Sequence, residues 1–345
     1  MKVTMILLIF VMVFGFVGAS APKKTKTIRF DNDRVYSIQY LPDGSRLAAS
    51  HFRRYVTLWD IQTGKLIWKH DFDDRSDKTN YIISEIHDLS VSRDGSMIAA
   101  AVLQERVVNG WLQNEQNARI VILDPSDGHI LQTLQTGSVP VGKVAISPDG
   151  TLIATGAFDG TSRIWSLSSG KQISEIKLSS GISVLIFSPD GRFLVVGRFP
   201  PRDFSIVQSP PAIVWDLTKG EEVREFQYDS LQATGAAFSP DGRMLALSGT
   251  GPQVVNLLDT ESWEVNKLAE NEFKATDLVF SNDNSTLFWL TGFLEDGFVF
   301  QFDVTARKRL KTLTIRPGPT SIAISPVRHE FAVGTVKGRI YLFRY

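Results

Sequence analysis

The sequence predicts an all-β fold in which one four-stranded antiparallel unit occurs seven times. A turn of the type Ser-Pro-Asp-Gly recurs, and its first residue serves as an anchor for each unit: Leu41, Ser92, Ser147, Ser188, Ser239, Ser281 and Ser325. A large apolar residue follows each anchor: Trp59, Leu123, Trp165, Trp215, Leu258, Phe302 and Phe343. The distance is 18 to 21 residues in five units, and 31 and 27 residues in the second and fourth, which contain insertions. Because the spacing is otherwise regular, one supersecondary unit repeats along the chain.

Residues 144–178 show the unit most clearly. Four strand-like segments are separated by turn residues, at 144–146, 152–156, 163–167 and 171–178. Pro and Asp preset a turn and Gly tolerates a left-handed backbone, so the intervening sequences favour tight turns. The last segment alternates apolar and polar residues, as a half-exposed edge strand does.

This unit resembles a WD repeat, the four-stranded blade of a β-propeller. The Trp-Asp pair of that family stands at Trp59-Asp60 and Trp215-Asp216, and Asp159 occupies the family's Asp position in the third unit. The family's Gly-His dipeptide is absent from every unit, so we expect blades held mainly by apolar packing. The resemblance covers about residues 25–345. It implies a seven-bladed propeller that acts as a non-enzymatic binding platform, and it says little about the partner.

The two ends of the repeat array are expected to meet. The seventh unit ends after its third strand, at residues 339–345, and residues 24–31 have the spacing of a missing fourth strand. Ile28 and Phe30 would lie on one side of that strand. We therefore expect an N-terminal strand to complete the last blade, which leaves no unpaired sheet edge where the ring closes.

The first 20 residues have the pattern of a secretory signal peptide. Lys2 precedes an apolar run, and small residues follow it at Gly18-Ala19-Ser20-Ala21. Cleavage is expected after Ala19 or Ser20, because Pro22 would follow a cut after Ala21. The alternative is an uncleaved signal anchor, since apolar and small residues continue to Ala21 and a span needs about 20. Either way, the propeller at 21–345 is expected outside the cytoplasm, in the periplasm or secreted.

Composition limits the classes of partner. Lys and Arg number 37 and so do Asp and Glu, so no net charge favours nucleic acid or an anionic membrane. A membrane enters only through an uncleaved anchor. The absence of Cys excludes disulfides, thiolate catalysis and Cys-ligated zinc. We expect a monomeric propeller with a protein or peptide partner.

Asp88, at the channel end of a first strand, is the position where a catalytic or metal site would be expected. The residues aligned with it around the ring are Ser37, Lys143, Val184, Gly235, Asp277 and Ser321. Two acids beside a lysine are not the converging ligands that a metal needs, so we expect an ion pair between Asp88 and Lys143 of neighbouring blades. Residues 71–77 carry alternate acids, but they lack the central Gly and distal Glu of a calcium loop. No catalytic residue, metal ligand or cofactor is assigned.

Three insertions lengthen the repeat, at residues 72–82, 103–118 and 198–211. Strand alternation places all three loops on one face of the disc. They carry Tyr, Trp and Arg, the residue types that dominate interface energies. We therefore expect a partner to contact Tyr81, Arg106, Trp111, Arg202 and Phe204. The alternative function is a propeller enzyme, or a glycan- or cell-wall-binding module, with a small site at the channel mouth.

Overall fold

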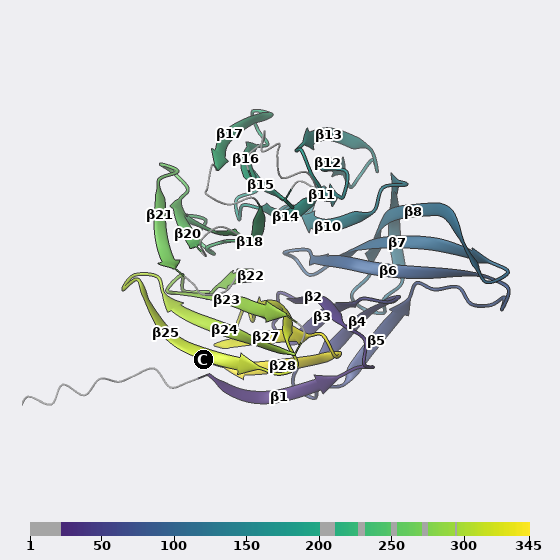
Figure 1. Cartoon of the computed structure of the whole chain (residues 1–345), viewed down its shortest axis with the longest axis horizontal. Coiled ribbons are helices and arrows are strands. Elements are labelled where there is room, and N and C mark those ends of the chain that lie inside the picture. Colours follow the sequence, from purple (N-terminus) through teal and green to yellow (C-terminus); the bar gives the residue numbers. More distant parts are fainter. Residues whose placement is uncertain (1–21, 201–210, 227–231, 250–253, 271–274, 294) are drawn as a thin grey trace, which may run out of the picture.

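The computed structural model describes residues 22–200, 211–226, 232–249, 254–270, 275–293 and 295–345. They form seven four-stranded antiparallel sheets arranged in a ring, which confirms the predicted seven-bladed propeller (Figure 1). The part of the chain that is described contains no helix, and so no helix that could cross a membrane.

Each blade is a meander of four strands that are consecutive in sequence, except in the seventh. The first three blades are β2 (Val35–Tyr40), β3 (Arg46–His51), β4 (Tyr55–Asp60) and β5 (Leu66–Asp71); β6 (Asn80–Val91), β7 (Ile98–Val108), β8 (Trp111–Leu123) and β9 (Ile130–Gly137); and β10 (Val141–Ile146), β11 (Leu152–Ala157), β12 (Thr161–Ser166) and β13 (Gln172–Lys177). The next three are β14 (Ile182–Phe187), β15 (Phe193–Arg198), β16 (Ala212–Asp216) and β17 (Glu221–Phe226); β18 (Ala233–Phe238), β19 (Met244–Gly249), β20 (Val254–Asp259) and β21 (Val265–Glu270); and β22 (Ala275–Phe280), β23 (Thr286–Phe293), β24 (Asp296–Asp303) and β25 (Lys308–Ile315).

The seventh blade joins the two ends of the chain. It consists of β26 (Pro319–Ile324), β27 (Glu330–Thr335), β28 (Arg339–Arg344) and the N-terminal strand β1 (Lys23–Arg29). β1 pairs antiparallel with β28, with Ile28 opposite Ile340. The predicted closing strand is thus confirmed. Ile28 is only 2% exposed, and it packs in an apolar cluster with side chains of the first and seventh blades.

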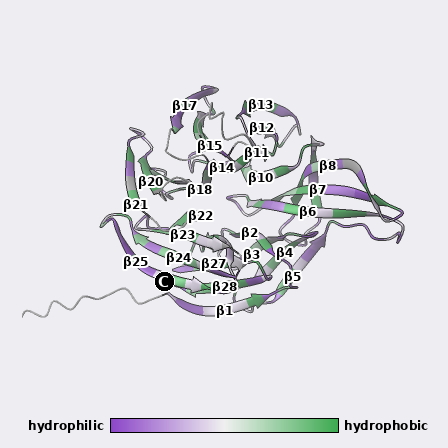
Figure 2. Ribbon diagram, viewed as in Figure 1, coloured by the Kyte–Doolittle hydropathy of each residue, from purple (hydrophilic) through white to green (hydrophobic). Residues whose placement is uncertain are grey.

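The apolar core is divided among the interfaces between blades. In the described residues, seven apolar clusters each join side chains of two neighbouring sheets. The outermost strands face solvent, and Figure 2 shows β17 and β25 largely in the hydrophilic colour. Packing between sheets that are apolar on both faces is what holds such a ring together.

Apolar packing is supplemented by a buried polar network in the first blade, which the sequence reasoning missed. The Nε2 atom of His51 lies 2.9 Å from the Thr57 hydroxyl, and the Trp59 indole donates to the same hydroxyl at 2.8 Å. In the third blade the Trp165 indole donates to the Thr155 hydroxyl at 3.0 Å. These bonds satisfy the indole N–H groups inside the sheets, which would otherwise be costly to bury.

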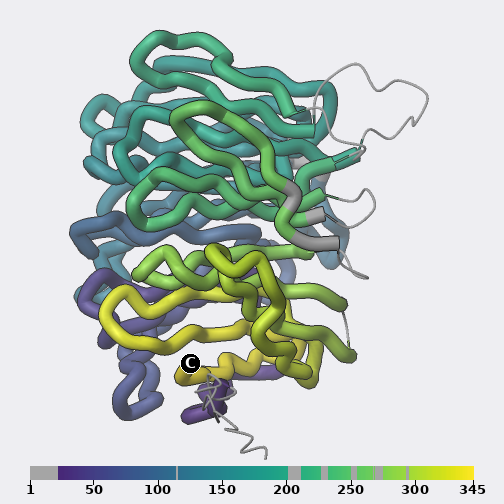
Figure 3. Tube along the Cα trace, turned by 90° about the vertical axis from the view of Figure 1, so that its left-hand side faces the viewer, coloured from purple at the N-terminus to yellow at the C-terminus, as the bar shows by residue number. Residues whose placement is uncertain are grey.

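The strands run between two faces of the ring, and Figure 3 shows them crossing the picture in successive blades. The turn face carries the turns that begin at the seven anchors. The turns between the third and fourth strands lie on the same face, where the Ile61 amide donates to the Ser45 carbonyl at 2.8 Å. The insertion face carries the connections between the second and third strands and those between successive blades, including residues 72–82 and 103–118. These two insertions lie side by side, because the Asn109 amide donates to the Thr79 carbonyl at 2.6 Å. Their predicted placement on one face is confirmed.

Candidate functional site

The largest departure from the regular blade is in the second blade. Its strands β6, β7 and β8 have 12, 11 and 13 residues, against 6 in each of β2, β3 and β4. Pairing between β6 and β7 runs without interruption from Ile86 opposite Val102 to Asn80 opposite Val108. We call residues 80–85, 103–108 and 111–117 the ribbon, which extends beyond the rest of the disc in Figure 1.

The expectation of a loop at residues 103–118 was therefore wrong. Asn109 and Gly110 have φ values of 50° and 80°, and Val108 pairs with Trp111 across them. This is a two-residue hairpin with a left-handed backbone at both central positions, the geometry that Asn-Gly favours most strongly. The Asn-Gly dipeptide was the signal that could have predicted it.

Three of the five predicted contact residues lie on the ribbon. Tyr81 pairs with Val107, and Arg106 pairs with the neighbouring Ile82. Because paired residues share a face and successive residues alternate, Tyr81 and Arg106 lie at adjacent positions but on opposite faces of the ribbon. Trp111 stands at the tip with 77% of its surface exposed, and Leu112 beside it is 54% exposed. Arg202 and Phe204 lie outside the described residues. The role of all five in partner binding stays a prediction.

The base of the ribbon is held by an almost fully buried carboxylate. Asp73 accepts the Ser84 amide at 2.7 Å and pairs with Arg75 at 3.0 Å. Arg54 of the first blade lies 3.8 Å from the same carboxylate. The Gln104 amide adds a bond of 3.0 Å to the Phe72 carbonyl. Since these contacts come from the first blade, β6 and β7, they fix the direction in which the ribbon leaves the disc.

The channel mouth on the insertion face is shaped by a bulge in the first strand of every blade. Pairing in each of these strands skips the residue five positions before the anchor. The skipped residues are Tyr36, His87, Gly142, Ser183, Thr234, Thr276 and Thr320. A bulge re-aims side chains at the end of a strand, so these positions ring the mouth.

An arc of aromatic rings follows the rim of this mouth from the first blade to the fourth. The rings of Phe52 and Tyr36 lie 5.3 Å apart between centroids, those of Tyr36 and His87 6.2 Å, those of His87 and Phe158 5.7 Å, and those of Phe158 and Phe199 6.1 Å. Phe158 and Phe199 are 45% and 40% exposed. We call these five residues the aromatic arc. Sequence reasoning missed it, although Phe52, Phe158 and Phe199 each stand eleven positions after an anchor.

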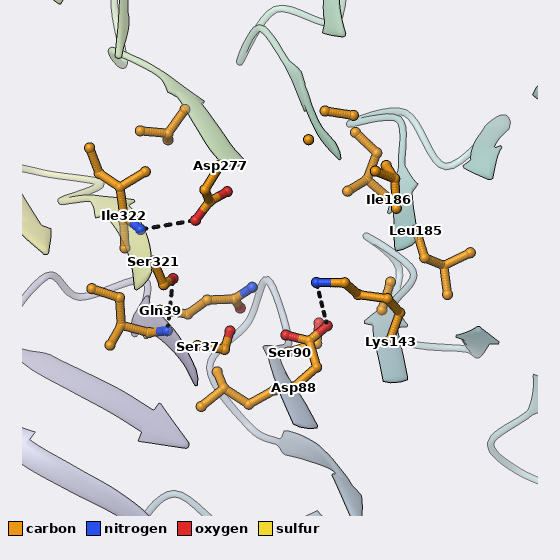
Figure 4. Close-up of a pocket in the computed structure, with 18 of the residues that line it drawn as sticks. Ser37, Gln39, Asp88, Ser90, Lys143, Leu185, Ile186, Asp277, Ser321 and Ile322 are labelled. Atoms are coloured by element: carbon orange, nitrogen blue, oxygen red, sulfur yellow. Dashed lines mark hydrogen bonds and ion pairs between the residues drawn. The ribbon is translucent and has the colours of Figure 1, made fainter. Parts of the chain in front are cut away.

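Beneath the mouth lies the central channel, a cavity of about 510 Å³. Lys143 points from the third blade toward Asp88 of the second, and their charged atoms are 4.0 Å apart (Figure 4). The predicted ion pair is confirmed. Asp277 lies on the opposite side of the channel from Lys143, and Leu185 and Ile186 line an apolar part of the channel wall.

Comparison with known proteins points to one family. The family model described as "WD domain, G-beta repeat" matches residues 128–166. An uncharacterized WD repeat-containing protein of Synechocystis sp. is 28% identical over 165 residues, 47% of this chain and 41% of that protein. Together with the seven four-stranded blades, these matches identify the type of propeller. The chain is a seven-bladed β-propeller of the WD-repeat type, similar to the WD-repeat proteins that it matches.

Other relatives match shorter stretches of this WD-repeat propeller. Small ribosomal subunit protein RACK1y of Oryza sativa subsp. japonica is 33% identical over 105 residues, 30% of each chain. Small ribosomal subunit protein RACK1 of Drosophila melanogaster is 30% identical over 108 residues, 31% of each chain. The chain spans less than half the length of the relatives named here, so their similarity extends to the repeat and not to a whole protein.

The acids in the channel of this WD-repeat propeller join its blades. Asp88 accepts the Val144 amide of the next blade at 3.3 Å, and Asp277 accepts the Ile322 amide of the next blade at 2.9 Å. Burial raises the pKa of Asp277 to about 6, although the Ile322 and Leu278 amides and the Lys143 charge act in the opposite direction. Both carboxylates therefore satisfy amides at the inner edge of a neighbouring sheet.

No group of three or more His, Asp or Glu side chains arranged to hold a metal occurs in the ranges that the structure describes. Three of the four acids at 71–77, namely Asp71, Asp74 and Asp77, instead accept backbone amides of their own turns. Asp74 accepts the Ser76 amide at 3.0 Å, and Asp77 accepts the Thr79 amide at 2.7 Å. Asx turns of this kind explain the alternate acids without a calcium ion.

Proposed function

We propose that this WD-repeat propeller is an exported, non-enzymatic scaffold that binds a protein partner through its insertion face. WD-repeat propellers are in general platforms for protein interaction. The observation that carries the proposal is the ribbon, which presents Trp111 at its tip with 77% of its surface exposed.

The ribbon suits recognition because its aromatic tip is carried by strands and held at its base. Folding leaves an indole in solvent without any benefit to the propeller itself, whereas a Trp buried by a partner commonly dominates the binding energy. The tip is a two-residue turn, and Asp73 anchors the base through Ser84 and Arg75. Little conformational entropy is then lost on binding, which favours affinity.

Export rests on the sequence of the first 20 residues, which lie outside the described residues. Mass spectrometry of the N-terminal peptide of extracellular or periplasmic material should find a start near Ser20 or Ala21. Material outside the cytoplasm that begins at Met1 would support the anchor, and material confined to the cytoplasm would contradict export.

Partner binding is tested by crosslinking the protein to its partner in the native envelope or secretome. Trp111→Ala should weaken capture by about 1–2 kcal/mol, roughly five- to thirty-fold, with little change in melting temperature. Ile67→Ala is the matched control, since Ile67 is an exposed apolar residue of the outer strand β5 at 43% exposure. Equal capture by the two variants would show that Trp111 does not contribute to partner binding.

The aromatic arc favours a second candidate, a glycan-binding module at the channel mouth. Rings that are exposed side by side, as Phe158 and Phe199 are, offer stacking surfaces for the apolar faces of sugar rings. Co-sedimentation with purified cell-wall polysaccharide should then be lost in Phe158→Ala and kept in Trp111→Ala. Loss in Trp111→Ala with retention in Phe158→Ala would place polysaccharide binding on the ribbon instead. No sedimentation of the unmodified protein would leave the protein-binding function alone.

A further inference from the structure

The outer edge of the ribbon is an unpaired strand edge. In the other six blades, the third strand is paired with the fourth from its first or second residue. In the second blade, pairing between β8 and β9 begins only at Ala118, opposite Gly137. Residues 111–117 of β8 therefore have no strand on their outer side among the described residues.

The inner edge of the ribbon is covered, in contrast. The Ile82 amide donates to the Asp74 carbonyl at 2.8 Å, and the Ser84 carbonyl accepts the Arg54 amide at 3.1 Å. Glu85 forms a bridge with Arg53 of the first blade. The propeller thus supplies backbone partners to one side of the ribbon and leaves the other side open.

The direction of the backbone groups on this edge follows from the pairing of β8. The Asp124 amide donates to the His129 carbonyl at 2.9 Å, on the side of β9. Pairing with β7 runs without interruption from Leu123 to Gln116, and the amides of a strand point alternately to its two sides. Counting back by twos from Asp124 places the Gln116 amide on the open side.

We infer that the partner of the insertion face binds by adding a β-strand to this edge, in line with β9. The inference rests on the proposed function and specifies its mode. An exposed apolar face accepts many occupants, but a row of backbone amides and carbonyls is matched by the backbone of an extended chain. The edge therefore defines the conformation of the segment that covers it.

The side chains near the edge define the chemistry of that segment. Residues 111–117 contain one charged residue, Glu115, and four neutral amides, Gln113, Asn114, Gln116 and Asn117. Trp111 and Leu112 expose apolar surface at the tip. The strand that fits is extended and largely uncharged, and it carries an apolar or aromatic side chain that covers Trp111.

The ladder is interrupted near the tip, because residues 113–115 lie opposite the single residue Arg106. Such a bulge protects an edge from indiscriminate pairing. It opposes the addition of a second copy through its own β8, since two bulges would have to meet. A short strand of another protein, paired beside Gln116 and Asn117, is compatible with it.

The test uses a random twelve-residue peptide library displayed on phage and selected on the full mature protein. Selected peptides should protect amides of residues 111–117 from hydrogen exchange by at least tenfold. Gln116→Pro, which removes an outward amide, should weaken their binding at least tenfold. Gln116→Ala, which keeps the amide, should change it less than twofold. Pro is tolerated on an edge strand where its nitrogen faces away from the paired neighbour.

Each alternative result has a distinct meaning. Equal effects of Gln116→Pro and Gln116→Ala, with binding still lost in Trp111→Ala, would overturn strand addition and leave the proposed function intact. Protection confined to the turn face, with no effect of Trp111→Ala, would contradict the proposed function itself. Residues 111–117 could also become protected without peptide as the protein concentration rises, together with dimers in sedimentation. That result would assign the edge to a second copy and overturn the inference. The exchange measurement on the unmodified protein decides the question even if Gln116→Pro disturbs the ribbon.

Discussion

Acidification should destabilise the propeller through one buried histidine. His51 is completely buried, and its ring lies 4.6 Å from that of Phe30. Burial lowers the pKa of His51 from 6.5 to about 4. The unfolded chain therefore binds a proton between these two pH values while the folded chain does not.

The sign and size of the effect follow from linkage. Stability from this group is fully present above pH 6.5, falls as the pH drops below it, and stops falling below about pH 4. The difference of roughly 2.5 pKa units corresponds to about 3 kcal/mol in total, and to about 2 kcal/mol by pH 5.

Urea unfolding of the mature protein at a series of pH values from 4.5 to 7.5 measures this directly. His51→Gln lowers stability at every pH, because it removes a packed ring. Between pH 7.5 and 5, however, the variant should lose about 2 kcal/mol less unfolding free energy than the unmodified protein. Burial also lowers the pKa of His70 and of His87 and raises that of Asp277. These three groups act alike in both proteins, so the difference between the two curves reports His51. Parallel curves for the two proteins would show that His51 does not stay neutral in the folded state.

The remaining predictions concern closure of the ring and the channel. Replacing both Ile28 and Phe30 with Asp places charges in the cluster that seals β1, so it should cost several kcal/mol and lower the melting temperature far more than the pair Ser76→Asp and Lys78→Asp. Similar shifts for the two pairs would mean that β1 does not close the ring. Asp277 has a folded pKa of about 6, above its ordinary 3.8, so its contribution to stability is greatest below pH 3.8 and is lost as the pH rises through 6. Asp277→Asn, which can still accept the Ile322 amide, should therefore gain up to about 3 kcal/mol at pH 8 and much less at pH 4 in thermal or urea unfolding. A variant less stable than the parent at pH 8 would contradict this.

The fold could be predicted from the sequence because each repeat contains the local signals of turns and strands. A turn, an apolar strand and a large residue at regular spacing predict one four-stranded sheet. Seven repetitions of this pattern predict seven sheets in a ring. The closing strand was expected at residues 24–31 and found at Lys23–Arg29, because the same period extends back through the start of the array.

The site was less predictable, because its parts come together only in the folded ring. The aromatic arc joins rings from four blades, and no spacing within one repeat shows that Tyr36 and His87 lie close together. The ribbon was mistaken for a loop because the polar residues 113–117 break the apolar alternation typical of strands. In this stretch, pairing with β7 and the Asn109-Gly110 turn outweigh the weak strand propensity of the sequence.

The position of β1 determines how the disc would sit on anything attached to the start of the mature chain. β1 is the outermost strand of its blade, and Lys23 lies opposite Arg344, at the end that faces the turns. A tether that precedes Lys23 therefore leaves the molecule at its rim, on the side remote from the ribbon. A propeller held there by an uncleaved anchor would direct the ribbon away from the bilayer, and one immobilised there on a sensor surface would keep Trp111 free for its partner.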